Sequence, residues 1–145
     1  MNTVRVKKLH PNAILPTYGS AEAAGADLYA CLDETVTIAP GEVCWVPTGI
    51  ALEVPKGCAG LVYARSSLGA KRGLAPANKV GVVDSDYRGE IKVVLLNHSK
   101  QTQTLEPGER VAQFVITPVL TPMYEEVEEL TDTSRGTGGF GSTGK

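Results

Sequence analysis

Short apolar runs alternate with turn signals along most of the chain. Turn-forming Pro and Gly residues interrupt these runs at positions 40–41, 47–49 and 55–57. The runs that predict strands span residues 4–9, 35–38, 43–46, 50–54, 61–64, 93–97 and 110–119. Short strands at this spacing predict one all-β domain, a closed barrel or a jelly roll. We expect the single tryptophan, Trp45, to fill its core.

Two further apolar runs, 80–83 and 90–96, flank a polar connection that contains Gly and predict a β-hairpin. Asp84 follows the first strand, and Tyr87 follows three residues later. A carboxylate at a strand exit can polarise a water, and an aromatic ring can form a floor for a sugar or a base. The same residue types are common in surface turns. This stretch alone leaves both interpretations open.

Residues 65–73 break the strand pattern and predict a short helix that ends near Arg72, with Ser66 as its N-cap. Arg65 and the hydroxyls of Ser66 and Ser67 could hold an anion there, because free N–H groups and the helix dipole favour negative charge. An ordinary capped helix would use the same residues. We expect loops before and after this region, at 11–20 and 73–79.

Two polar residues stand out in apolar surroundings. Asp27 is the one charge in the small-residue run 23–30, where it either caps a turn, faces water or serves a site. Gln113 interrupts the apolar run 110–119, and a buried Gln must bond either to neighbouring backbone or to a ligand. We assign no chemistry to His10 and His98, which lie far apart in the sequence.

The C-terminal residues differ from the rest of the chain. We expect a β-barrel domain over 1–130 and a flexible arm over 131–145, because the arm has no aliphatic side chain with which to form a core. It is either a disordered solubilising tail or a lid. Arg135 suits a phosphate, the glycines allow close backbone approach, and Phe140 can stack on a base.

Composition narrows the function classes. The 145 residues suit one domain, and a net charge of −2 offers no basic field to nucleic acid or anionic lipid. Cys31, Cys44 and Cys58 have no metal-type spacing and are expected to be small buried hydrophobes in a reducing compartment. The charged first ten residues do not resemble a signal peptide, and no run approaches the ~20 apolar residues of a membrane span. We expect a cytoplasmic protein.

Five segments, in order, resemble the motifs of the trimeric dUTP pyrophosphatase (dUTPase) family. They are Ala24–Ala30, Ala64–Gly69, Gly81–Gly89, Pro107–Gln113 and Arg135–Ser142. Any one of them is unspecific, whereas five in order cover almost the whole chain. One small departure is Glu109, where Asp is commoner in the family.

The resemblance implies a jelly-roll-like β-barrel (β-clip) that forms a homotrimer with its active sites between subunits. One subunit would supply the second and fourth motifs, a neighbour the third, and the last subunit its arm, with Phe140 stacked on uracil. The substrate would be dUTP, hydrolysed to dUMP and pyrophosphate with Mg²⁺. The implied substrate-binding residues are Arg65, Ser66, Ser67, Asn78, Gly81, Val82, Val83, Asp84, Tyr87, Lys92, Gln113, Arg135, Phe140 and Gly141.

The same resemblance implies a role for each group. Asp84 would orient the attacking water and accept its proton. Asp27 would act through a water bound to Mg²⁺, since this ion gives up water reluctantly. The phosphate chain would be held by Arg65, Ser66, Ser67 and Gln113, with Arg135 at the γ-phosphate.

Base selection would fall to the third motif. Asn78 and the backbone of Val82, Asp84 and Lys92 would bind the uracil edge in a pocket too tight for the methyl group of thymine. Tyr87 under the sugar would leave no space for a 2′-hydroxyl.

Two other functions are compatible with a β-barrel of this kind. The related dCTP deaminases need a Glu ten residues after the third-motif Asp, and that position is Val94 here. A non-catalytic β-barrel binding module would have no need for Asp84, Tyr87, Arg135 and Phe140 together.

Overall fold

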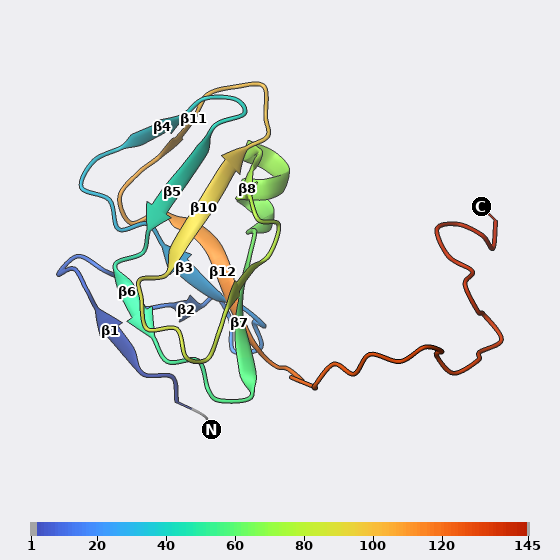
Figure 1. Ribbon diagram of the computed structural model, residues 1–145. Helices are drawn as coiled ribbons and strands as arrows, with labels where there is room; N and C mark the ends of the chain where they lie inside the picture. Colours follow the sequence, from blue (N-terminus) through green and yellow to red (C-terminus); the bar gives the residue numbers. More distant parts are fainter. Residues whose placement is uncertain (1–2, 145) are drawn as a thin grey trace.

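Twelve short strands and one π-helix make up the regular structure in residues 3–144, which are the residues that the computed structural model describes (Figure 1). The strands are β1 (Val6–Lys8), β2 (Thr17–Tyr18), β3 (Ala26–Tyr29), β4 (Val36–Ile38), β5 (Val43–Pro47), β6 (Ile50–Leu52), β7 (Cys58–Tyr63), β8 (Leu74–Pro76), β9 (Gly81–Val83), β10 (Lys92–Asn97), β11 (Gln103–Leu105) and β12 (Arg110–Pro118). The helix, η1, is Ser67–Arg72. The predicted all-β, jelly-roll-like fold with one short helix is confirmed.

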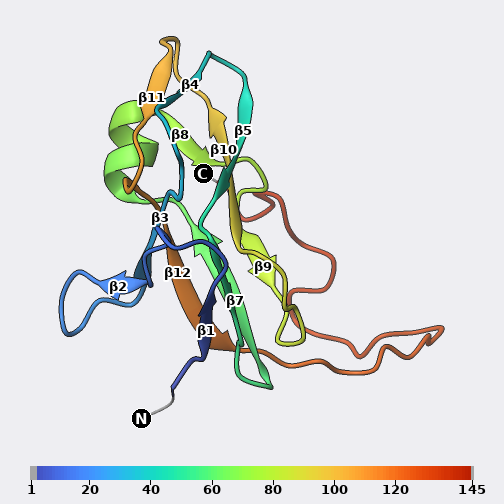
Figure 2. The ribbon, with the colours of Figure 1, turned by 90° about the vertical axis from the view of Figure 1, so that its left-hand side faces the viewer.

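All strand pairs are antiparallel. The largest sheet has the order β2-β3-β12-β7-β9, and a second sheet has the order β5-β10-β8. The pairs β1–β6 and β4–β11 complete the barrel wall (Figures 1 and 2). One apolar core lies between these sheets, because alternate residues of each strand point inward. Its most buried side chains are Leu28, Ile38, Val46, Ile50, Leu74, Ile91, Val93, Leu95, Leu105 and Val111.

Each run predicted as a strand overlaps one, but four strands were not predicted: β2, β3, β8 and β11. β2 and β8 fall within the expected loops. These strands have two to four residues, and β3, β8 and β11 pair with strands that are distant in sequence. Local propensity carries little information about such pairing.

The predicted hairpin of residues 80–96 was wrong. β9 pairs with β7, whereas β10 lies between β5 and β8. Residues 84–91 therefore cross from one sheet to the other instead of closing a two-stranded turn. Asp84 still stands directly after β9, as expected.

The expected core position of Trp45 was also wrong, because its side chain is 67% exposed. Val46 points into the core from β5, and its neighbour Trp45 must point outward because strand side chains alternate. Trp45 lies opposite Val94 of β10 on this outer face.

The expected helix forms, but Ser66 does not cap it as predicted. The backbone of Ser66 is itself helical (φ −57°, ψ −42°), and its side chain makes no capping hydrogen bond. The helix is of the π type, and it ends at Gly73, whose positive φ of 68° suits glycine.

The three cysteines are half-buried and unpaired. Burial raises the pKa of the Cys44 thiol, and for Cys31 the carboxylates of Asp33 and Glu90 add to the effect of burial. None of the three is fully buried, which differs from the expectation.

After β12 the described chain, up to residue 144, contains no helix or strand and extends away from the barrel (Figures 1 and 2). Phe140 is fully exposed there. Within the described residues, no helix is long and apolar enough to cross a membrane.

Candidate active site

A cavity of about 490 Å³ opens where the chain passes from β9 to β10. This volume is in the range of small-molecule sites. Its lining comprises Trp45, Val62, Asn78, Gly81, Val82, Val83, Asp84, Tyr87, Glu90, Ile91, Lys92 and Val94. Seven of these are predicted site residues, and they come from the third motif and its surroundings.

The connection after β9 fixes the Tyr87 ring at the cavity. The Tyr87 amide donates to the Asp84 carbonyl (3.2 Å), and its hydroxyl donates to the Glu90 carbonyl (2.9 Å). Gly89 allows this placement, because a Cβ atom there would overlap with the Tyr87 hydroxyl. The ring is thus held at both ends of the connection while one side remains open to a ligand.

Asp84 lines the same cavity and is exposed. Within residues 3–144, its carboxylate makes no side-chain hydrogen bond and no ion pair. Both of its oxygens are therefore available to a water or a ligand. Asn78 lies close by, and a Cβ atom at Gly81 would come within 3.2 Å of its Nδ2 atom.

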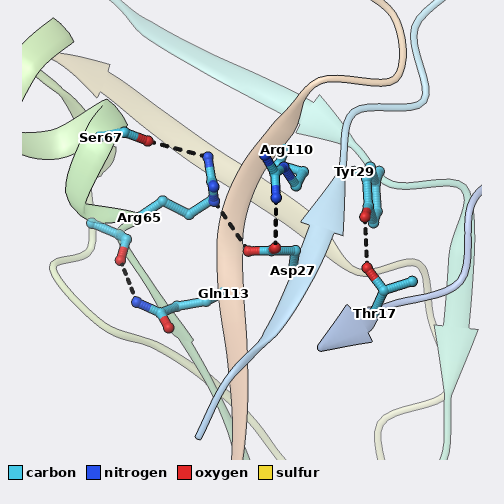
Figure 3. A network of polar contacts seen from close by, with 8 residues as sticks. Thr17, Asp27, Tyr29, Arg65, Ser67, Arg110 and Gln113 are labelled. Carbon is cyan, nitrogen blue, oxygen red and sulfur yellow. Dashed lines mark hydrogen bonds and ion pairs between the residues drawn. The ribbon is translucent and has the colours of Figure 1, made fainter. Parts of the chain in front are cut away.

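A second group of polar residues lies around Asp27, which belongs to β3 and lies near the start of η1 (Figure 3). Arg65 Nε donates to Asp27 Oδ1 (3.0 Å), and Arg110 Nη1 donates to Oδ2 (3.4 Å). Arg65 Nη1 also donates to the Ser67 hydroxyl (3.3 Å). We call Asp27, Arg65, Ser67 and Arg110 the Asp27 cluster. Because it contains two guanidinium groups and one carboxylate, the cluster has a net positive charge that suits an anion.

Gln113 sits next to the Asp27 cluster in Figure 3. Its Nε2 atom donates to the Ala64 carbonyl (2.9 Å), so of the two alternatives it bonds to backbone. Gly25 leaves room for it, because a Cβ atom at Gly25 would lie 2.7 Å from its Oε1 atom. Among the described residues, the Ser66 side chain makes no hydrogen bond to the cluster.

The Asp27 cluster cannot supply a metal cage. Both oxygens of Asp27 already accept from guanidinium groups, and residues 3–144 hold no group of three or more His, Cys, Asp or Glu residues placed to bind a metal. Each carboxylate oxygen keeps a further lone pair that can accept from a water. The cluster therefore fits a hydrated cation held by its ligand, and not a directly coordinated one.

The predicted site residues thus fall into three separate groups in one chain. The cavity contains none of the residues of the Asp27 cluster and none of the arm. In the arm, Arg135 Nε donates to the carbonyl of nearby Gly138 (2.6 Å), and Phe140 and Gly141 are exposed.

Sequence reasoning missed several residues at these sites. Arg110 approaches Asp27 only through the pairing of β12 with β3, and Trp45, Val62 and Val94 enter the cavity only because of how the sheets meet. Glu90 could have been found, because it is a charged residue only six positions after Asp84.

Comparison with known proteins identifies the family of this chain. The chain matches the dUTPase family over residues 11–144. It is 49% identical over 142 residues to the deoxyuridine 5'-triphosphate nucleotidohydrolase of Syntrophotalea carbinolica, with 98% of this chain and 97% of that protein covered.

Solved structures are similar over the same length. The dUTPase of Staphylococcus bacteriophage 80alpha with dUpNHpp has a TM-score of 0.91 and 30% identity, with 100% of both chains covered. A mutant dUTPase from phage phi11 of S. aureus, described with a structural Mg(II) ion, has a TM-score of 0.81 and 27% identity. The alignment covers 90% of this chain and 100% of the phage chain. With a family match over nearly its whole length and a full-length relative at almost half identity, this chain belongs to the dUTPase family.

Proposed function

We propose that this protein hydrolyses dUTP to dUMP and pyrophosphate, with Asp84 as the general base. The observation that carries the proposal is the unpartnered Asp84 carboxylate at a cavity in which Tyr87 is fixed by two hydrogen bonds. Family membership supports the choice of substrate.

The uracil ring enters the cavity between β9 and β10. Within residues 3–144, β9 is an edge strand that pairs with β7 alone, so N–H and C=O groups of its other edge are available to a ligand. Uracil presents an acceptor, a donor and an acceptor along one edge, and we assign its recognition to backbone groups of Val82, Asp84 and Lys92, which line the cavity. Cytosine presents these groups in a different order, so it would not form the same hydrogen bonds. The ring of Tyr87 lies under the sugar and excludes a 2′-hydroxyl. Asn78, Gly81 and Val83 complete this part of the site.

The phosphate chain lies on the Asp27 cluster and the start of η1. Arg65 and Arg110 supply charge, and Ser66, Ser67 and Gln113 supply neutral hydrogen bonds. Asp27 would hold a hydrated Mg²⁺ by accepting a hydrogen bond from one of its waters, and the ion would supply positive charge against the phosphates.

We infer that a complete site combines residues from several copies of the chain. The cavity and the Asp27 cluster share no residue, and the arm contacts neither of them by a side-chain hydrogen bond within the described residues. We assign a homotrimer in which one subunit binds the base, a neighbour binds the phosphates, and the 131–145 arm closes the site with Arg135, Phe140 and Gly141. The unpaired cysteines fit a reducing, cytoplasmic location.

Catalysis then depends on one proton transfer. A water held by Asp84 lies in line with the α-phosphorus, loses its proton to the carboxylate and displaces pyrophosphate. The developing charge is met by the guanidinium groups that already hold the chain.

Pyrophosphate release from dUTP, dCTP, dTTP and UTP tests the function. We expect strong preference for dUTP. Equal turnover of all four would refute the pocket assignment, and ammonia from dCTP would restore the deaminase alternative.

Subunit mixing tests the assembly. Asp84→Asn and Arg65→Ala variants should each be nearly inactive, because each lacks one half of the site. Mixed trimers, refolded together, should regain activity, since some sites then combine Asp84 of one subunit with Arg65 of another. Mixtures that stay inactive although the subunits co-assemble would place both residues in one subunit's site.

A further inference from the structure

The connection that carries Asp84 and Tyr87 has few ties to the rest of the barrel. Residues 84–90 contain no strand or helix, and their backbone forms one turn, from Tyr87 to Asp84. Ile91, the next residue, is buried and bonded to Ile50 and Thr48. Between Val83 and Ile91, the position of the proposed base therefore depends on side-chain contacts.

Arg88 provides most of these contacts. Its Nη1 atom donates to the carbonyls of Ser85 (2.8 Å) and Tyr87 (3.0 Å), one on each side of Asp86. Its Nε atom lies 3.9 Å from Glu53 Oε1, just after β6. Among residues 3–144, this is the only side-chain hydrogen bond or ion pair that joins the 84–90 connection to another part of the chain.

The backbone of Glu53 is part of the barrel, because its amide donates to the carbonyl of Arg5 on the β1 side (3.0 Å). The Arg88 guanidinium thus links a residue of the barrel to two carbonyls inside the connection. A charged donor makes stronger hydrogen bonds to carbonyls than a neutral one does. The exposed ion pair with Glu53 contributes little on its own.

We propose that Arg88 is a positioning residue for the reaction: it sets the backbone that presents Asp84 to the attacking water and Tyr87 to the sugar. This inference rests on the proposed function. Small displacements matter far more to a proton transfer than to folding, because about 1 Å of misplacement can cost ~10²-fold in rate. A half-exposed side chain contributes little to overall stability.

Arg88→Ala tests the inference, with Arg5→Ala as the matched control. Arg5 also pairs with Glu53 (3.6 Å), and its side chain is 82% exposed. Within residues 3–144, it makes no side-chain hydrogen bond or ion pair with the connection. We expect kcat of Arg88→Ala to fall roughly ten- to hundredfold, with little change in Tm or in trimer content. Arg5→Ala should match the parent. Added guanidinium ion should partly restore Arg88→Ala, and Arg88→Lys should lie between the two.

Two results would overturn the inference. One is an Arg88→Ala variant whose kcat and KM both stay within about twofold of the parent. The other is a fall in kcat together with a clear fall in Tm or in trimer content, because a general loss of structure would then explain the lost activity.

Hydrogen exchange separates this inference from the function. The Tyr87 amide, bonded to the Asp84 carbonyl, should exchange faster in Arg88→Ala than in the parent or in Arg5→Ala, with no substrate present. A parent that does not hydrolyse dUTP would refute the function, and the exchange rate would then still decide the role of Arg88. Unchanged exchange in Arg88→Ala would refute that role, whatever the activity.

Discussion

Replacing Asp84 by Asn is the most direct test of the mechanism, because the structure separates its catalytic effect from any effect on folding. The carboxylate is exposed and makes no side-chain hydrogen bond or ion pair within residues 3–144. An isosteric amide therefore removes no contact, and the stability should change by no more than about 0.5 kcal/mol. The amide can still hold a water but cannot accept its proton. Loss of a general base costs ~10²–10⁴-fold in rate, which is about 3 to 5 kcal/mol in the barrier.

The assay is pyrophosphate release at saturating dUTP, together with binding of a non-hydrolysable dUTP analogue. Asp86→Asn is the matched control, because Asp86 lies in the same connection, is exposed and does not line the cavity. Asp84→Asn should bind the analogue like the parent and lose turnover, and Asp86→Asn should keep both. Near-normal turnover in Asp84→Asn would refute the base assignment. Equal losses in both variants would show that only the charge of the connection matters.

Two other predictions concern the cavity and the arm. Trp45 is the only tryptophan and lines the cavity with 67% of its surface exposed, so saturating dUMP should change its emission; an unchanged spectrum with bound dUMP would place the ligand elsewhere. Deletion of 131–145 should leave a folded trimer with weak activity, because Arg135 and Phe140 are lost while the barrel core is intact. Full activity of the truncated protein, measured with its mass in solution, would show that the arm has no part in catalysis.

The elements that sequence could predict are those fixed by local pattern. The strands of the core follow the alternation of apolar and polar residues, and Asp84 stands after β9 because the apolar run ends at Val83. The wrong prediction of a core position for Trp45 also follows from this alternation. Its size suggested the core, but the alternation that points Val46 inward leaves Trp45 outside, and in this strand alternation outweighs hydrophobicity.

The elements that sequence could not predict depend on pairing between distant segments. Two apolar runs around a polar connection resemble a hairpin, yet β9 pairs with β7 and β10 with β5. This error concealed the origin of the cavity, which lies where the chain passes between two sheets. Arg110 is a similar case, because only the register of β12 against β3 brings it to Asp27. Neither pairing leaves a signature within a window of ten residues.

The segment between the last strand and the Gly-rich arm adds a physical reason for assembly. β12 ends at Pro118, and residues 119–130 contain large apolar side chains that the chain's own barrel does not cover. Leu120, Met123 and Tyr124 are each more than 90% exposed. Apolar groups so fully in water favour burial against another surface. The polar arm beyond them has no such need and suits a ligand, so a subunit that anchors 119–130 on a neighbour would carry Arg135 and Phe140 to a site outside its own barrel.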